Sequence, residues 1–427
     1  MHHALPLLID WVPRQRWFAA TGGTARLRLL AEIPMDGAAP DAEVSVLLIA
    51  DDATDRPVVY QVPVVVRHDP SPAPSAAVIG TTSDGMTLLD GPHDPAFTSA
   101  LMRQIAPGVE ATAEVLRGEQ SNTSIIFHPT AGRPVICKVF RQVEEGTNPD
   151  IELQTVLTDA GSSHVPAVIG AVTGSWPDPL VGAHIASGSL AFAQEFFPGV
   201  SDAWRVALGA AADDTDFTAA AADLGRTTAD VHRDLARLLP TRPATGTARE
   251  TVAAAWLRRL DIALVEVPAL RPHEAAIRAC YADAMGVDWP DLQRIHGDYH
   301  LGQVLQVPGR GWVLLDFEGE PMRPIGERRE PDLALRDIAG MLRSFDYVAG
   351  SVLQEGPPSV PAVLAWADAA RTAFLAGYAA AMPGAAGGPL LAALELEKAV
   401  YEAIYEARHR PGWLSIPLAA VERLAED

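Results

Sequence analysis

The spacing of apolar residues changes near residue 200, and this change constrains the fold more than any other feature of the sequence. The first part carries β-branched runs separated by polar turns, and residues 42–50 and 56–68 predict a β-hairpin. A β-rich part followed by a helical part favours an α+β fold over a doubly wound parallel sheet. Apolar residues at helical spacing occupy the alanine-rich stretches 204–238, 247–264, 271–286, 332–350, 359–382 and 387–409.

A chain of 427 residues is long enough for two or three domains. We expect a helix over residues 94–106, because Asp94 suits the N-cap and Pro95 the first helical position. An antiparallel meander is predicted over residues 111–140, followed by a helix over 148–161. The predicted domains are a β-rich cap (1–108), a second β-containing lobe (109–199) and a helical lobe (200–427) that a β motif at 294–321 interrupts.

Charge and composition exclude several classes of protein. The net charge of −21 argues against nucleic acid and anionic membranes as partners. The two cysteines, Cys137 and Cys280, are too few for a disulfide framework or a zinc cluster, which favours a reducing cytosol. The sequence suggests neither a signal peptide nor a membrane span. We therefore expect a cytoplasmic protein that is a monomer or a weak homodimer.

Residues 296–303, HGDYHLGQ, place an amide five residues after an aspartate. This is the spacing of the kinase catalytic loop, in which the aspartate accepts the proton of the acceptor hydroxyl and the amide binds Mg²⁺. The sequence thus predicts Asp298 as general base and Gln303 as a metal ligand. The apolar run after them ends in Asp316 and Glu318, so that Asp316 matches the metal-binding aspartate of kinases. Taken singly, Asp298 and Asp316 are equally compatible with ordinary turn caps.

Lysine is scarce in this chain, and Lys138 lies within the apolar strand PVICKVF. An ammonium in such a strand needs a partner, and Glu152 on the next helix is the natural candidate. Together they predict the lysine–glutamate pair that orients the phosphates of ATP in kinases. The alternative is an exposed lysine on an edge strand. The turn over residues 118–124, which joins the first two strands of the meander, is predicted to cradle phosphate through Ser121, Asn122 and Thr123, although an ordinary hairpin turn explains it as well.

Residues 194–198, QEFFP, follow a strand and precede the helical part. An extended segment at this junction offers backbone N–H and C=O groups to adenine, so Gln194, Glu195 and Phe196 are predicted nucleotide contacts. The alternative is a strand end before a Pro-Gly breaker.

Together these motifs resemble the aminoglycoside phosphotransferase-like kinases, and more closely the actinobacterial maltokinases. The resemblance covers nearly the whole chain and is most specific at HGDYHLGQ and DFEGEP. It implies a kinase-like bilobal fold with an extra N-terminal cap, and ATP and Mg²⁺ as cofactors. The segments that carry it are WVPRQRWF (11–18), NPDIE (148–152), QEFFP (194–198), HGDYHLGQVL (296–305), LLDFEGEPMRP (314–324), ERREPDLALRDIAGMLRSFDY (327–347) and YEARHRPGWLSIP (405–417).

The resemblance also implies that the C-terminal helices build the pocket of a sugar acceptor. The chain departs from the maltokinase pattern at residues 20–24 and 333–334, which favours glucosamine over maltose as acceptor and leaves glucose open. Aromatic rings and the carboxylates of Asp337, Glu402 and Glu406 suit an amino sugar. A catalytically inactive kinase-like binding protein is the alternative from another class. The implied sugar-pocket residues are His300, Arg336, Asp337, Arg343, Asp346, Tyr347, Glu402, Tyr405, Arg408 and Trp413.

Overall fold

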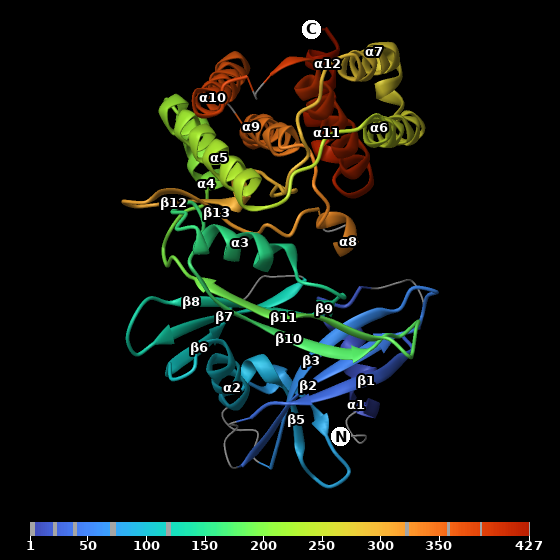
Figure 1. Cartoon of the computed structure of the whole chain (residues 1–427), viewed down its shortest axis with the longest axis vertical. Coiled ribbons are helices and arrows are strands. Elements are labelled where there is room, and N and C mark those ends of the chain that lie inside the picture. Colours follow the sequence, from blue (N-terminus) through green and yellow to red (C-terminus); the bar gives the residue numbers. More distant parts are fainter. Residues whose placement is uncertain are drawn as a thin grey trace. The chain divides into compact units, whose positions relative to one another are not determined.

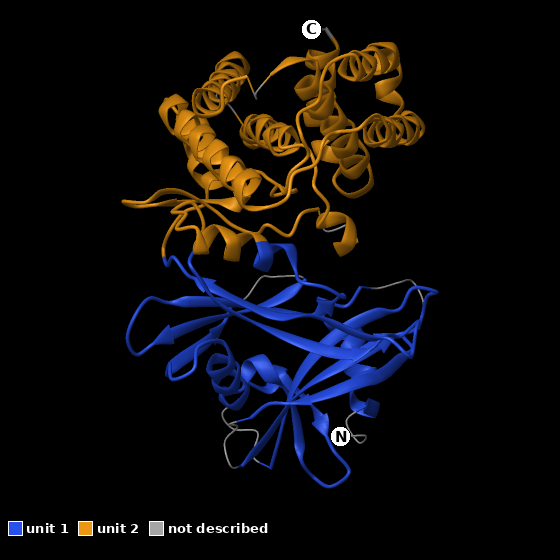
Figure 2. Cartoon of the chain, in the orientation of Figure 1, with its two compact units in different colours: residues 1–152, 166–198 blue, residues 153–165, 199–427 orange. Residues whose placement is uncertain are grey.

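The computed structural model describes residues 5–19, 24–36, 41–68, 74–116, 121–320, 324–356, 359–384 and 387–426. Within these ranges the chain forms two compact units, shown in Figure 2. Unit 1 comprises residues 1–152 and 166–198, and unit 2 comprises residues 153–165 and 199–427. The predicted change from β to helical structure near residue 200 is confirmed, whereas the three predicted domain boundaries stay predictions.

Unit 1 contains two antiparallel sheets, labelled in Figure 1. The first has the strand order β1-β2-β3-β5-β4, with β9 paired to β3, and the second has the order β10-β11-β8-β7-β6. The strands are β1 (Leu27–Pro34), β2 (Ala42–Asp51), β3 (Val58–Arg67), β4 (Val78–Thr81), β5 (Thr87–Asp90), β6 (Ala111–Val115), β7 (Asn122–Pro129), β8 (Val135–Phe140), β9 (Gln142–Val143), β10 (Val168–Pro177) and β11 (Ile185–Glu195). The helices are α1 (Leu5–Trp11), α2 (Pro95–Ile105) and α3 (Pro149–Asp159), which crosses the boundary into unit 2.

The predicted hairpin, meander and helix starts are confirmed in unit 1. Asp94 caps α2, since its side chain accepts a hydrogen bond of 2.8 Å from Ala96 N. One apolar core contains residues of α2 and of both sheets. The buried Gln61 amide, on β3, donates to the carbonyls of Phe140 and Leu190 at 2.8 and 2.9 Å, and so links the first sheet to the second. The two sheets therefore share one core.

Unit 2 is built from helices around a small hairpin. The hairpin strands are β12 (Val304–Val307) and β13 (Gly311–Leu314). The helices are α4 (Ala203–Ala212), α5 (Thr218–Leu238), α6 (Gly246–Glu266), α7 (Glu274–Met285), α8 (Ile325–Arg328), α9 (Leu335–Glu355), α10 (Val360–Ala381), α11 (Gly388–His409) and α12 (Ser415–Glu426). Short 3₁₀ turns occur in unit 2 at residues 268–273, 301–303 and 411–413, and in unit 1 at residues 12–14, 75–77 and 91–93.

Helices α5 and α10 pack closely in unit 2, side by side in Figure 1. A Cβ atom on Gly377 would lie 1.9 Å from the carbonyl oxygen of Ala222, so this crossing requires glycine. The predicted helix over residues 204–238 is two helices, because the chain turns between α4 and α5 with Asp214 at a φ of +50°. None of the helices within the described ranges combines the length and the apolar character needed to cross a bilayer.

Candidate active site

The predicted catalytic loop runs between α7 and β12 and carries Asp298 in a partly buried position. Gly297 makes the turn possible, since its φ is +85° and a Cβ there would lie 3.0 Å from the Cα of Gly319. Among the described residues, Lys398 of α11 is the charged partner of the Asp298 carboxylate, with Nζ 3.9 Å from Oδ1. Asp298 also lines a cavity, as a residue that acts on a bound acceptor must.

Asp337, near the start of α9, binds the backbone of this loop. Its Oδ2 accepts from the backbone N–H of His296 at 2.8 Å, and its Oδ1 accepts from that of Gly297 at 2.9 Å. His232 Nε2 lies 3.0 Å from Asp337 Oδ2, and His232 Nδ1 lies 2.9 Å from the Tyr378 hydroxyl. Asp337 is 2% exposed. The prediction that Asp337 contacts the sugar is therefore wrong, because its carboxylate is buried and both of its oxygens accept hydrogen bonds from the loop backbone.

Replacing Asp337 with alanine is expected to lower the free energy of unfolding by about 3–5 kcal/mol, because buried donors lose a charged acceptor. Burial alone would raise the pKa of the Asp337 carboxyl, but the hydrogen bond from His232 and its charge hold the pKa below the ordinary value. A lowered folded-state pKa stabilises above the ordinary value of about 3.9, and this contribution is lost as the pH falls further. Urea denaturation from pH 7 to pH 3 checks both points.

The matched control is Asp223→Ala, which removes an exposed carboxylate that pairs with Arg226. We expect this control to cost less than about 1 kcal/mol. The difference in stability between wild type and Asp337→Ala should narrow below about pH 4. A difference that widens on acidification would contradict the assigned role of Asp337.

Gln303 and Asp316 come together as predicted. Gln303 Nε2 donates to Asp316 Oδ2 at 3.0 Å, and Leu315 N donates to the Gln303 carbonyl at 2.8 Å. Asp316 has a φ of +67°, a left-handed conformation that is costly for a residue with a side chain and that often marks functional sites. Glu318 offers a carboxylate oxygen within 4.8 Å of one of Asp316. Mg²⁺ prefers oxygen ligands of this kind. The sequence analysis assigned Gln303 and Asp316 to the metal, but not Glu318.

A cavity of about 480 Å³ in unit 2 opens beside Asp298. Five of the predicted sugar-pocket residues line it, namely His300, Tyr347, Glu402, Tyr405 and Trp413. His300 Nδ1 accepts from Gly302 N at 3.0 Å, and burial lowers the pKa of its imidazole. The sequence analysis missed the other polar and aromatic lining residues, which are Trp204, Tyr299, Ser344, Lys398, Tyr401 and Arg410.

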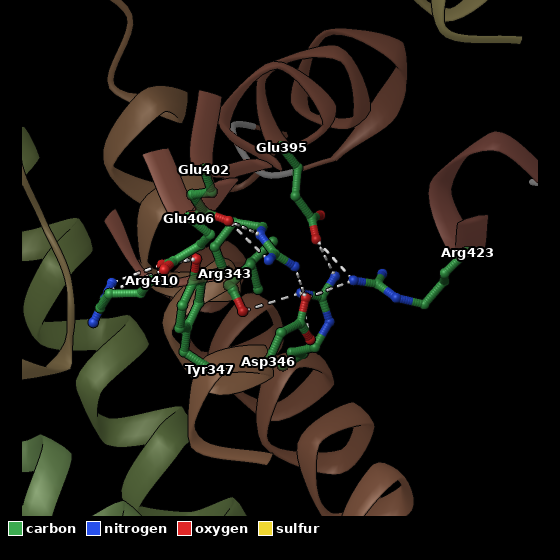
Figure 3. A network of polar contacts seen from close by, with 10 residues as sticks. Arg343, Asp346, Tyr347, Glu395, Glu402, Glu406, Arg410 and Arg423 are labelled. Carbon is green, nitrogen blue, oxygen red and sulfur yellow. Dashed lines mark hydrogen bonds and ion pairs between the residues drawn. The ribbon is translucent and has the colours of Figure 1, made fainter. Parts of the chain in front are cut away.

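Several residues that line the cavity belong to a network of polar contacts, shown in Figure 3, namely Tyr347, Glu402, Glu406 and Arg410. Arg343 Nε donates to Glu402 Oε2 at 2.8 Å. Glu406 is almost fully buried and accepts from the Tyr347 hydroxyl at 2.9 Å and from Arg410 at 2.6 and 2.9 Å. Burial raises the pKa of the Glu402 carboxyl despite the opposing charges of Arg343 and Lys398. Glu402 is thus a carboxylate whose charge the protein compensates incompletely.

Four implied sugar contacts lie outside this cavity. Arg343 is 1% exposed and supports Glu402 from within the core. Asp346 pairs with Arg343, Arg371 and Arg423, and it lines a second cavity of about 530 Å³ instead. Arg408 is exposed and pairs with Glu266, while Arg336 pairs with Asp332 and Glu397. The resemblance implied these four residues as sugar contacts, but a family motif on a helix does not tell which polar residues face a cavity and which face another helix.

In unit 1, Lys138 on β8 pairs with a carboxylate that the sequence analysis did not select. Its Nζ lies 3.2 Å from Oδ2 of Asp150, which is fully buried at the start of α3. The side chain of Asn148 caps this helix by accepting from Asp150 N at 2.8 Å. The clue was the motif NPD, in which Asn148 fixes the helix start. The structure thus adds Asp150 as a partner of Lys138, while the predicted pair with Glu152, two residues further along α3, stays a prediction.

The register of β7 and β8 separates the predicted phosphate contacts. Ser124 lies directly opposite Lys138, and Thr123 lies opposite Val139. Because neighbouring side chains alternate between the faces of a sheet, Thr123 points away from the face of Lys138. Its hydroxyl instead accepts from Arg141 Nε at 2.8 Å. A phosphate contact by the Thr123 side chain is therefore wrong, while Asn122 lies on the face of Lys138 and Ser121 is exposed in the turn. Residues 118–120 of this turn lie outside the described ranges.

Strand β11 ends at the predicted adenine segment. The backbone N–H groups of Glu195 and Phe196 donate to the carbonyls of Ala167 and Pro134 at 2.8 and 2.9 Å, which makes these two donors unavailable to adenine. Glu195 also forms an ion pair with Arg133. Gln194 lies on the face of Lys138, and its buried Oε1 has no hydrogen-bond donor among the described residues. An exocyclic amino group of a nucleotide base would supply one.

Comparison with known proteins agrees with this geometry. Residues 11–94 match the maltokinase N-terminal cap domain, and residues 112–319 match the phosphotransferase enzyme family. A glucosamine kinase of Mycolicibacterium smegmatis is 30% identical over 333 residues, which cover 72% of this chain and 78% of that protein. A glucosamine kinase of Streptacidiphilus jiangxiensis is 29% identical over 322 residues, or 70% of each chain.

Solved structures share the fold. A glucosamine kinase in complex with glucosamine, ADP and inorganic phosphate superposes with a TM-score of 0.69 at 23% identity, over 93% of this chain and 94% of that one. The predicted resemblance to maltokinase-like and aminoglycoside phosphotransferase-like kinases is thereby confirmed. The chain belongs to the phosphotransferase enzyme family, in the group of sugar kinases that carry a maltokinase-type N-terminal cap.

Proposed function

We propose that this protein is an ATP-dependent glucosamine kinase that transfers the γ-phosphoryl group to the 6-hydroxyl of glucosamine. The observation that carries the proposal is the 480 Å³ cavity, which holds Asp298 at one place and the incompletely compensated Glu402 at another. Relatives at 29% and 30% identity that are glucosamine kinases support the same acceptor. Asp298 would accept the proton of the acceptor hydroxyl as phosphoryl transfer begins.

The proposed nucleotide-binding residues lie in unit 1, and the proposed metal ligands lie in unit 2. In unit 1, Lys138 with Asp150 would bind the phosphates, and the buried Gln194 oxygen would accept from the base. In unit 2, Gln303, Asp316 and Glu318 form an oxygen donor set that fits Mg²⁺. Bound Mg²⁺ supplies positive charge to the phosphate oxygens during transfer. The side chains of Gln303, Asp316 and Glu318 would determine the position of the metal ion.

The charges that line the cavity favour a cationic acceptor. Glu402 uses Oε2 to bind Arg343, and among the described residues no hydrogen bond reaches its Oε1. Both oxygens of Glu406 are occupied by Tyr347 and Arg410. Glu402 is therefore the carboxylate with room for the ammonium of glucosamine, and a charged hydrogen bond in such a site is strong. Glucose, with a hydroxyl in place of the ammonium, would offer Oε1 of Glu402 only a neutral donor, and that hydrogen bond would be weaker.

We expect glucosamine to exceed glucose at least about tenfold in kcat/KM, because replacing a charged donor to Glu402 with a neutral one costs about 1.5 kcal/mol or more. N-acetylglucosamine, which lacks the charge and adds bulk, should be nearly inactive. Glu402→Gln should remove most of the preference for glucosamine over glucose. The measurement is initial rates with the four acceptors glucosamine, N-acetylglucosamine, glucose and maltose.

Glu266→Gln serves as the control, because Glu266 pairs with Arg408 outside the cavity. This variant should keep the preference of the wild type. A second candidate, phosphorylation of maltose, is favoured by the match to the maltokinase cap domain. Maltose exceeding glucosamine more than tenfold in the same assay would replace the glucosamine proposal with that candidate.

A further inference from the structure

The chain contains two lysines against 31 arginines, and neither lysine lies at an ordinary surface position. Lys138 pairs with Asp150 in unit 1, and Lys398 projects from α11 into the acceptor cavity of unit 2. Where arginine serves nearly everywhere as the cation, these two positions retain a compact ammonium. The two cations are not interchangeable, since a guanidinium is planar and broad whereas an ammonium is a point charge.

Lys398 is held on several sides. Its Nζ lies 3.1 Å from Glu320 Oε1, 3.9 Å from Asp298 Oδ1 and 5.4 Å from the centre of the Tyr401 ring. The Glu320 contact is a strong charged hydrogen bond. The distance to Asp298 is an ion-pair distance, too long for a hydrogen bond of that strength. Glu320 and Tyr401 thus fix the ammonium in place, and the ammonium acts on Asp298 by its charge.

Asp298 has no other such support among the described residues. No hydrogen bond to its carboxylate occurs there, and Lys398 is the cation within ion-pair distance. His300, two residues later in the loop, does not provide a charge, because burial lowers its pKa and its Nδ1 accepts from Gly302 N. The loop backbone is fixed by Asp337, but the side chain of Asp298 can rotate about its own bonds.

We propose that Lys398 is the positioning residue of the catalytic base, an ammonium that orients the Asp298 carboxylate toward the acceptor hydroxyl. The inference rests on the proposed function in that Asp298 is taken as the base. One carboxylate oxygen faces the ammonium, and the other is left to accept the proton of the acceptor. Orientation of a reacting group is worth much in rate, since a misplacement of about 1 Å can cost 10²-fold.

Lys398→Met is expected to lower kcat about 10- to 100-fold while the KM for ATP stays unchanged. Lys398→Cys should be similarly slow, and it permits a rescue. Alkylation with 2-bromoethylamine rebuilds an ammonium at nearly the length of lysine, whereas iodoacetamide gives a neutral adduct. The native thiols should react little, because burial raises the pKa of Cys137 to about 12 and that of Cys280 to about 11.

The aminoethylated variant should recover at least about tenfold in kcat over the neutral adduct, with equal thermal stability of the two forms. Arg226→Met, which removes a half-exposed cation that pairs with Asp223, is the control and should match the wild type. Equal kcat for the two adducts, or a Lys398→Met variant as fast as the wild type, would overturn the proposal. If the wild type phosphorylates another sugar instead of glucosamine, this result refutes the proposed acceptor but not the role of Lys398. The Lys398 comparison then uses that sugar, or water as acceptor if no sugar reacts.

Discussion

Asp298→Asn is expected to lower kcat by about 10²–10⁴-fold, the range for losing a general base. The substitution keeps the shape of the side chain but replaces a basic carboxylate with a neutral amide, which does not take up the hydroxyl proton. ATP affinity should change little, because the phosphates are assigned to other groups. Steady-state rates with saturating glucosamine, together with equilibrium binding of ATP, measure the two quantities separately.

Asp291→Asn provides a matched control, since Asp291 is exposed in the segment that leads into the loop. It should leave kcat at the wild-type value. An Asp298→Asn variant that keeps more than half of the wild-type activity would sink the assignment of the base. Loss of ATP binding in that variant would point instead to a damaged fold.

Asp316→Ala is expected to abolish measurable turnover. The substitution takes a carboxylate from the oxygen donor set of Gln303, Asp316 and Glu318. Without that charge Mg²⁺ binds weakly, and the phosphate oxygens lose the cation that stabilises the charge of the transition state. Activity measured across a titration of Mg²⁺ is the test, and added Mg²⁺ should restore little of the rate.

The control here is Asp283→Ala, an exposed carboxylate near the end of α7 that should not alter the Mg²⁺ dependence. Full activity of the wild type in excess chelator would contradict the metal assignment. An Asp316→Ala variant that regains wild-type kcat at high Mg²⁺ would reduce Asp316 to one contributor to metal affinity.

Local sequence signals predicted much of the fold. The cap of α2 needs Asp94 and Pro95 alone, and the β2–β3 hairpin needs two β-branched runs and a turn. Strand β10 was missed because its residues alternate between partial and full exposure, so few of them are strongly apolar. Helix α12 was missed because Pro417, near its start, interrupts a pattern that is short already. Both elements form because tertiary packing stabilises them.

The proposed catalytic loop could be located in the sequence because its motif depends on spacing within one short segment, as for Asp298 and Gln303. Partners brought from distant elements were not predictable in the same way. The resemblance implied that Asp337 contacts the sugar, yet its carboxylate accepts hydrogen bonds from the loop backbone. Lys398 is separated from Asp298 by 100 positions, and nothing in the residues around it identifies its partner. Asp150 was not selected as a partner of Lys138, because its burial at the start of α3 is not stated by the sequence.

The Arg343 network bears on how such an enzyme can change its acceptor during evolution. Glu402 is tied through Arg343 to Asp346, and Asp346 to Arg423 on α12, so residues on three helices share one set of charges (Figure 3). A single replacement of Glu402 leaves the buried Arg343 short of a counter-charge, which is costly before any new acceptor is gained. Routes to a new sugar therefore begin with residues that line the cavity without belonging to the network, such as Trp204 and Tyr401. The charged residues of this network should persist among descendants whose acceptors have already diverged.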